Sequence, residues 1–168
     1  MKDKILVAYA TRYGSTADVA EAIGDELRTM GADVDVRPVD KVQELTPYRA
    51  AVIGSPIYMG KWLPESQVFI EKNQQRLRSI PVAFFAVGLT TTDENPEVIR
   101  KAEASMDAVR MLVTPVEAGI FPGRLESSVL SPTDRAIITM IRAKTGDFRD
   151  FQVVRAWAQA VWQKIAVV

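Results

Sequence analysis

The chain has 168 residues with 21 basic and 21 acidic side chains, and its pI is near 6.3. It has no cysteine and no histidine, which excludes disulfides, thiolate iron–sulfur ligation, His- or Cys-ligated haem, the usual zinc sets and every nucleophile–His triad. Redox chemistry would therefore need an organic cofactor. The balanced charge argues against nucleic-acid binding, and nothing resembles a signal peptide or membrane span, so we expect one cytoplasmic domain over residues 1–168.

The first stretch of the chain combines a buried-type strand with a phosphate-type turn. Residues 5–10 are almost unbroken apolar, the hydroxyl-rich turn Thr11–Thr16 follows, and a helical pattern then runs to a stop at Gly31. Such a unit directs free backbone N–H groups and the positive end of the helix at one point, which favours the binding of a phosphate. The alternative is an ordinary turn in which Ser15 or Thr16 caps the helix.

Two better-known phosphate loops are absent from this turn. It lacks the G-x-x-x-x-G-K-[ST] pattern of nucleoside-triphosphate loops, and it has one glycine where a dinucleotide fingerprint needs three. A turn with several hydroxyls and one glycine suits a single phosphate, and this favours a mononucleotide.

The remaining predicted elements alternate strands with helices. Strands are expected over residues 34–39, 50–54, 81–88 and 114–120, and helices over 64–78, 96–109 and 152–165. Pro38 suits an edge strand, whereas Val68 and Ile99 are expected to face inward from their helices. The alternation predicts an α/β fold, a doubly wound five-stranded parallel sheet in the order 2-1-3-4-5 with helices on both faces.

Residues 121–150 form an extended segment before the last helix, too long for an ordinary connection. It contains a predicted helix with Ser131 as N-cap, Pro132 in its first position and Gly146 as its stop. One use of this helix is peripheral contact with a quinone or a membrane surface; the alternative is a local lid on the sheet edge. The residues behind the first use are Arg135, Ile137, Ile138, Ile141, Arg142 and Lys144.

In the predicted strand order, a ligand would lie at the carboxyl ends of strands one and three. The loops there are Thr11–Thr16, Ser55–Trp62 and Gly88–Asp93. Tyr58 and Trp62 offer flat rings on which a flat heterocycle could stack. The alternative is that these two rings only cover the end of the sheet.

Other side chains near these loops carry less weight. Thr90, Thr91 and Thr92 could hydrogen-bond a ligand, and Arg12 either faces the phosphate or is solvated. The methionines Met59 and Met111 are expected to fill the core rather than to contact a cofactor.

The same sheet topology also serves phospho-acceptor receiver domains, which need an acidic pair after strand one and an Asp after strand three. Those places read Ala10-Thr11 and Gly54-Ser55. Without carboxylates there is no site for a hard cation, so a receiver is excluded and no metal is expected.

The two loops together resemble those of a known family. Thr11–Thr16, followed by a helix, resembles the FMN phosphate loop of flavodoxins, and Gly54–Gly60 resembles their second loop, where an aromatic commonly covers the flavin. Within this superfamily the chain most resembles the branch that includes menaquinone-dependent protoporphyrinogen dehydrogenase. That similarity rests on the long segment before the final helix and on the run Lys144–Asp147 leading to Trp157.

The resemblance implies an FMN-binding, flavodoxin-like oxidoreductase, and no side chain stands out as catalytic. One hypothesis is an enzyme that oxidises a porphyrinogen or another organic donor and reduces a quinone; the other is an electron carrier or redox module for larger partner proteins. Under the enzyme hypothesis, a short linker in place of residues 122–149 would leave FMN bound but abolish turnover. The expected cofactor-binding residues are Thr11, Arg12, Tyr13, Gly14, Ser15, Thr16, Ser55, Pro56, Ile57, Tyr58, Met59, Gly60, Trp62, Gly88, Leu89, Thr90 and Thr91.

Overall fold

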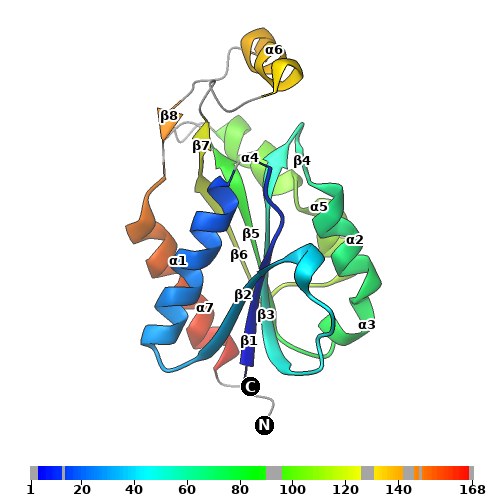
Figure 1. Cartoon of the computed structure of the whole chain (residues 1–168), viewed down its shortest axis with the longest axis vertical. Helices are drawn as coiled ribbons and strands as arrows, with labels where there is room; N and C mark the ends of the chain where they lie inside the picture. Colours follow the sequence, from blue (N-terminus) through cyan, green and yellow to red (C-terminus); the bar gives the residue numbers. More distant parts are fainter. Residues whose placement is uncertain are drawn as a thin grey trace.

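The structure, a computed structural model (Figure 1), describes residues 4–12, 14–89, 96–125, 131–141, 146–147 and 149–166. The strands are β1 Lys4–Tyr9, β2 Asp33–Pro38, β3 Tyr48–Tyr58, β4 Lys61–Trp62, β5 Val82–Leu89, β6 Glu117–Pro122, β7 Arg124–Leu125 and β8 Gly146–Asp147. The α-helices are α1 Ser15–Thr29, α2 Pro64–Lys72, α3 Gln74–Leu77, α4 Pro96–Ala104, α5 Asp107–Leu112, α6 Pro132–Ile141 and α7 Phe151–Ile165, and a 3₁₀ turn, η1, covers Val39–Lys41.

The main sheet confirms the predicted topology. Its parallel strands follow the order β2-β1-β3-β5-β6, and the short β4 pairs antiparallel with β3. Because β2 is at the edge, Pro38 at its end removes no central hydrogen bond. All the strands of the order run the same way, so their carboxyl ends, and the loops that follow β1, β3 and β5, meet at one edge of the sheet.

Helices cover both faces of the sheet, as predicted (Figure 1). Ile5 and Val7 of β1 pack with α1 and α7, whereas Leu6 and Ala8 pack on the opposite face, where α2, α3 and α5 lie. The side chains of these four residues are fully buried. Because both faces are covered, the strand has no polar side to show, which explains its continuous apolar sequence.

Two predicted helices are each interrupted in the structure. The helix expected over 64–78 divides into α2 and α3 at Asn73, whose side-chain amide donates to the Phe69 carbonyl. The helix expected over 96–109 divides into α4 and α5, next to Ser105, whose hydroxyl donates to the Ala102 carbonyl. Short polar side chains that bond the preceding turn compete with the helical ladder.

Two side chains of these helices face the other way from the prediction. Val68 is 57% exposed and Ile99 is 36% exposed, so the inward direction expected for them is wrong; Phe69 of α2 and Leu77 of α3 are buried. The last main strand also begins later than predicted, at Glu117.

Gly54 lies in tight contact with the neighbouring strand β5. A Cβ atom at this position would lie 2.1 Å from the ring of Phe85 on the neighbouring strand. No larger residue fits there unless the ring moves, so the glycine lets β3 continue straight into the second loop.

The segment after β6 contains a two-stranded antiparallel ribbon, β7 with β8, and the helix α6. Figure 1 shows α6 standing beyond the carboxyl ends of the main strands. The predicted cap is confirmed, because the Ser131 hydroxyl accepts from the Asp134 amide at 3.1 Å. Gly146 is not the helix stop: α6 ends at Ile141, and Gly146 lies in β8.

Candidate functional site

The first loop joins β1 to the amino end of α1. Gly14 is the N-cap residue with φ of 88°, a left-handed conformation that suits glycine, and its amide donates to the Thr11 hydroxyl at 2.9 Å. The Asp18 amide makes a helical bond to the Gly14 carbonyl at 3.3 Å. The amides of Ser15, Thr16 and Ala17 precede this bond and, as in every helix, have no acceptor within it. They are the groups to which an anion would bind.

The hydroxyls of this loop have different roles. The Thr11 hydroxyl holds the turn, and Thr16 is 1% exposed. The Ser15 hydroxyl accepts from the amide of Arg124 at 3.0 Å. Neither Ser15 nor Thr16 caps α1 with its side chain, so that alternative is wrong. Tyr13 lies outside the described residues.

The second loop is a tight hairpin rather than an open loop. Strand β3 continues to Tyr58, and Ile57 and Tyr58 pair with Trp62 and Lys61 of β4. The turn is Met59-Gly60, with φ of 54° and 78°. Positive φ at both central residues is the pattern of a type I′ turn, which matches the twist of paired strands.

The structure corrects the expectations for three side chains of the second loop, Ser55, Met59 and Trp62, and for Met111 on α5. Ser55 is fully buried, and its hydroxyl accepts from the Leu63 amide at 2.9 Å and donates to the Pro56 carbonyl at 2.8 Å, so it holds the hairpin. Met59 at the turn is 68% exposed, and Met111 on α5 is 84% exposed, so neither fills the core.

Trp62 is the third correction. Its side chain is 1% exposed and lies edge-on to Phe84, with ring centroids 5.4 Å apart. A ring enclosed in this way has no free face for a flavin in this structure. The alternative, that it covers the end of the sheet, therefore applies to Trp62, and Tyr58 remains the stacking candidate of the pair.

Tyr58 belongs to a polar cluster that the sequence did not predict. The Tyr58 hydroxyl donates to Asp134 Oδ1, while Arg12 donates to Asp134 Oδ2 from Nε at 2.8 Å and from Nη2 at 2.7 Å. The guanidinium of Arg12 also lies 4.5 Å from the centre of the Tyr58 ring, within the range of a cation–π contact. Arg12 is therefore not merely solvated; it joins the first two loops to α6.

Asp134 is the residue of this cluster that sequence reasoning missed. It is 3% exposed, an unusual position for a carboxylate unless it is paired. The spacing Ser131-x-x-Asp134 is a capping-box signal that draws attention to the helix start. Nothing local indicates, however, that Asp134 would bind a side chain 122 residues away.

The third loop follows β5. Strand β5 ends at Leu89, and Gly88 packs against Ile57 so closely that a Cβ atom would lie 2.9 Å from Ile57 Cβ. The second and third loops thus start side by side. Thr90, Thr91 and the rest of the third loop lie outside the described residues, as do Arg142 and Lys144 and the side chains of Ile138 and Ile141.

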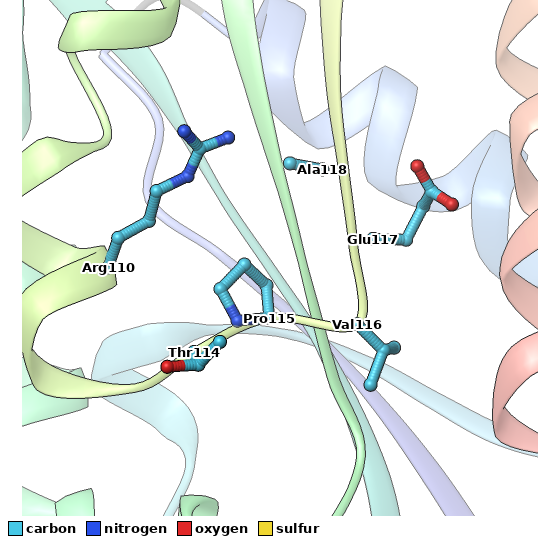
Figure 2. A pocket seen from close by; sticks show the side chains of 6 residues that line it. All are labelled: Arg110, Thr114, Pro115, Val116, Glu117 and Ala118. Atoms are coloured by element: carbon cyan, nitrogen blue, oxygen red, sulfur yellow. The ribbon is translucent and has the colours of Figure 1, made fainter.

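A pocket lies far from these loops. An open depression of about 570 Å³ is found at the amino end of β6, beside α5 (Figure 2). Arg110 and Glu117 line it, but Glu117 pairs with Lys164 at 3.0 Å. None of the residues that the sequence singled out contributes to this pocket.

The described residues hold no group of three or more acidic, His or Cys side chains suited to a metal ion. In the same part of the chain, no helix is long and apolar enough to cross a membrane.

Comparison with known proteins assigns the family. A family model described as "Flavodoxin domain" matches residues 6–152. The protoporphyrinogen IX dehydrogenase [quinone] of Escherichia coli (strain K12) is 30% identical over 165 residues, covering 93% of this chain and 90% of the relative. The NAD(P)H dehydrogenase (quinone) of Caulobacter vibrioides is 28% identical over 90 residues, covering 40% of this chain and 45% of the relative.

Solved structures show the same fold at low identity. An archaeal flavodoxin aligns with a TM-score of 0.60 and 21% identity, covering 97% of this chain and 99% of the flavodoxin. The Streptococcus pneumonia TIGR4 flavodoxin aligns with a TM-score of 0.61 and 17% identity, covering 96% and 99% of the two chains. With the loops after β1, β3 and β5 meeting at one edge of the sheet, the matching family model and the relative of similar length, the chain belongs to the flavodoxin-domain family.

Proposed function

We propose that this chain binds FMN at the loops after β1, β3 and β5 and acts as a flavin-dependent dehydrogenase that reduces a quinone. The observation that carries the proposal is the start of α1, where Gly14 turns the chain and three amides precede the first helical bond. The flavodoxin domain implies FMN. The Escherichia coli relative, named as a quinone-linked protoporphyrinogen IX dehydrogenase, supports the choice of a porphyrinogen as donor and a quinone as acceptor.

The residues present fit the phosphate end of FMN. A helix of 15 residues starts at Ser15, so its amide dipoles favour an anion at that end. Gly14 has no neighbouring atom within 4 Å of where a Cβ would lie, and its φ of 88° disfavours any other residue. We assign the phosphate to the amides of residues 15–17, with the hydroxyl of Thr11 keeping the turn in place.

The residues also fit the ring end, though with one aromatic instead of two. Tyr58 is held at the end of β3 by its bond to Asp134 and by the guanidinium of Arg12. The backbone of Ile57, Gly60 and Gly88 lies at the same edge of the sheet and would supply polar groups to the ring.

FMN bound here would supply the redox chemistry, since the chain has no cysteine or histidine that could hold a second redox centre. Overall, the donor gives up an electron pair with its protons, and the quinone gains an electron pair and protons to become a quinol. The part of this chain is to bind the phosphate, to place a ring beside Tyr58 and to limit the access of water.

Reconstitution tests the cofactor. The purified chain with excess FMN should give a bound-flavin absorption spectrum and quenched flavin fluorescence, with FMN preferred over FAD because the loop after β1 suits a single phosphate. Equal affinity for FAD, or no binding of either flavin, would refute the phosphate assignment.

Turnover tests the dehydrogenase. The reconstituted chain should oxidise protoporphyrinogen with a menaquinone analogue as acceptor, followed by porphyrin fluorescence, with free FMN at the same concentration as the control. A chain that binds FMN and reduces cytochrome-type acceptors but gives no such turnover would be a flavodoxin-type carrier instead.

A further inference from the structure

The segment between β6 and α7 contacts the start of α1 and the loop before it at several points. These contacts come from Arg124 after β6, from Asp134 in α6 and from Arg149 just before α7. We call these three residues the clamp. All their partners in α1 and its loop lie between Arg12 and Asp18, which is the stretch proposed to hold the phosphate.

Arg149 contacts both the segment itself and α1. It grips Asp147 with two bonds, from Nε at 2.9 Å and from Nη2 at 2.7 Å, and it reaches Asp18 in the first turn of α1 from Nη1 at 2.7 Å. Its side chain is only 11% exposed, whereas those of Asp18 and Asp147 are about half exposed. A bidentate pair between a guanidinium and a carboxylate holds the two groups in a defined relative orientation, in addition to their charge attraction.

The Asp18 contact has a consequence for an anion at the same helix end. Asp18 lies in the first turn of α1, where its negative charge would oppose a phosphate. The guanidinium of Arg149 pairs with this carboxylate. The pairing would reduce the electrostatic repulsion between Asp18 and a phosphate bound at the start of α1.

Asp134 of α6 bonds to Arg12, which lies in the loop before α1. Both Arg12 bonds go to Oδ2, while Oδ1 accepts from Tyr58, so a single buried carboxylate joins the first and second loops to α6. Arg124 adds the third contact, its backbone amide donating to the Ser15 hydroxyl at 3.0 Å.

We propose that the clamp pre-orders the phosphate loop, with Asp134 and Arg149 as positioning residues that raise the affinity for the phosphate end of the flavin. The proposal rests on the proposed function for the identity of the ligand. It reverses the expectation that residues 122–149 are dispensable for FMN binding, because removing them would release the loop and leave the charge of Asp18 unpaired.

The alternative is that Arg12 itself binds the phosphate and that Asp134 merely competes for it. The two ideas predict opposite signs for one substitution. If Asp134 positions the loop, Asp134→Asn weakens FMN binding; if Asp134 competes for Arg12, the same change frees the guanidinium and strengthens binding.

The first test is therefore FMN affinity by fluorescence quenching in Asp134→Asn and Arg149→Ala. Each should bind FMN on the order of tenfold more weakly, the scale of one charge-assisted hydrogen bond. Arg149→Lys should restore part of the loss, since it keeps the charge but not the fork. Met140→Ala on α6 and Arg155→Ala on α7, both at exposed positions, are the controls and should bind as the parent does. Tighter binding in Asp134→Asn, or unchanged binding in both clamp variants, would overturn the clamp.

The second test needs no flavin. The amides of Gly14 and Asp18 are hydrogen-bonded to the Thr11 hydroxyl and to the Gly14 carbonyl. Their hydrogen exchange in the flavin-free protein should be faster in both clamp variants by about tenfold, because local opening then costs less. Exchange in β3 should stay at the parent level. If the parent chain binds no FMN, the proposed function fails, whereas this exchange experiment still decides the clamp. Unchanged exchange at Gly14 and Asp18 would refute it.

Discussion

In the part of the chain that the structure describes, the main sheet and the segment between β6 and α7 make contacts of different kinds. In the sheet, side chains such as Leu6, Ile53 and Phe84 are fully buried and meet helices on both faces. The segment contacts the rest of the chain through Arg149, Asp134 and their polar partners. Among the described residues, the sheet therefore depends on apolar burial and the segment on charged pairs.

Because of this difference, we expect the sheet to determine the stability of the fold and the segment to determine the conformation of the ligand-binding loops. Burial of large apolar side chains supplies most of the free energy of folding, whereas ion pairs with a half-exposed partner supply little. Damage to the sheet should unfold the whole chain. Damage to the segment should leave the chain folded and change only the loops that it touches.

The largest expected effect is in the sheet. Phe84→Ala removes a fully buried ring that packs against Trp62 and should lower the free energy of unfolding by about 3–5 kcal/mol. Met111→Ala, at a side chain that is 84% exposed, is the control and should change it by less than about 0.5 kcal/mol. Urea unfolding followed by tryptophan fluorescence measures both. Similar losses in the two variants would contradict the assignment of Phe84 to the core.

The next effect distinguishes the two aromatic residues of the hairpin. Trp62→Leu should cost about 2 kcal/mol of stability, below the usual cost of truncating a buried aromatic to Ala, because the buried indole N–H has no partner among the described residues. Tyr58→Leu should instead weaken FMN binding by about 1 kcal/mol, the usual worth of an aromatic contact. Urea unfolding and flavin titration of both variants make the comparison. A larger loss of flavin affinity in Trp62→Leu than in Tyr58→Leu would reverse the assignment.

A smaller effect concerns the alkaline limit of the sheet. Burial, followed by the hydrogen bond to the Asp35 carboxylate, raises the pKa of Tyr48 from 10.0 to about 12. The folded state thus favours the protonated phenol. Its contribution is complete below pH 10 and is lost as the pH rises towards 12.

Urea unfolding between pH 9 and about pH 11.5 should show this loss, on the order of 1–2 kcal/mol. Tyr48→Phe should flatten part of the dependence; Tyr9, whose pKa burial also raises, acts in the same direction and accounts for a remainder. If the slope in Tyr48→Phe equals that of the parent, Tyr48 is not the source.

The smallest effect concerns the acid limit of the segment. The hydrogen bonds from Arg149 lower the pKa of Asp147 from 3.8 to about 2. The pair is complete above pH 3.8 and is lost as the pH falls through about 2. A carboxyl titration by NMR should place the Asp147 midpoint near 2 in the parent and higher in Arg149→Ala, where the backbone amide of residue 149 and the charge of Arg124 still lower the pKa. Equal midpoints in the two proteins would contradict the paired geometry.

The regular part of the fold followed from local patterns. The edge position of Pro38 and the cap at Ser131 are confirmed. These features depend on hydrophobic period and on chemistry within a few residues, which a sequence displays directly. The loops after β1 and β3 were named for the same reason, because each directly follows an apolar run.

The errors share a different cause. Val68, Ile99 and Met59 were assigned inward directions by residue type, yet all three side chains are exposed, Met59 at the turn Met59-Gly60. Their exposure depends on how neighbouring elements pack, and no local pattern reports that.

The sequence by itself determined the α/β class, because the alternation of strands and helices is a pattern of neighbouring residues. Given that class and an edge-type second strand, the right-handed crossover rule was enough to predict the strand order. The hydroxyl-rich turn at residues 11–16 was also visible as a local pattern. Only the tertiary structure decided that Trp62 is a core residue and that Asp134 and Arg149 reach the start of α1. The Arg12–Asp134 and Asp18–Arg149 pairs join residues 122 and 131 positions apart. The sequence around a charged residue does not indicate which distant residue it will pair with. These pairs form only when the folded chain brings the segment after β6 to the start of α1.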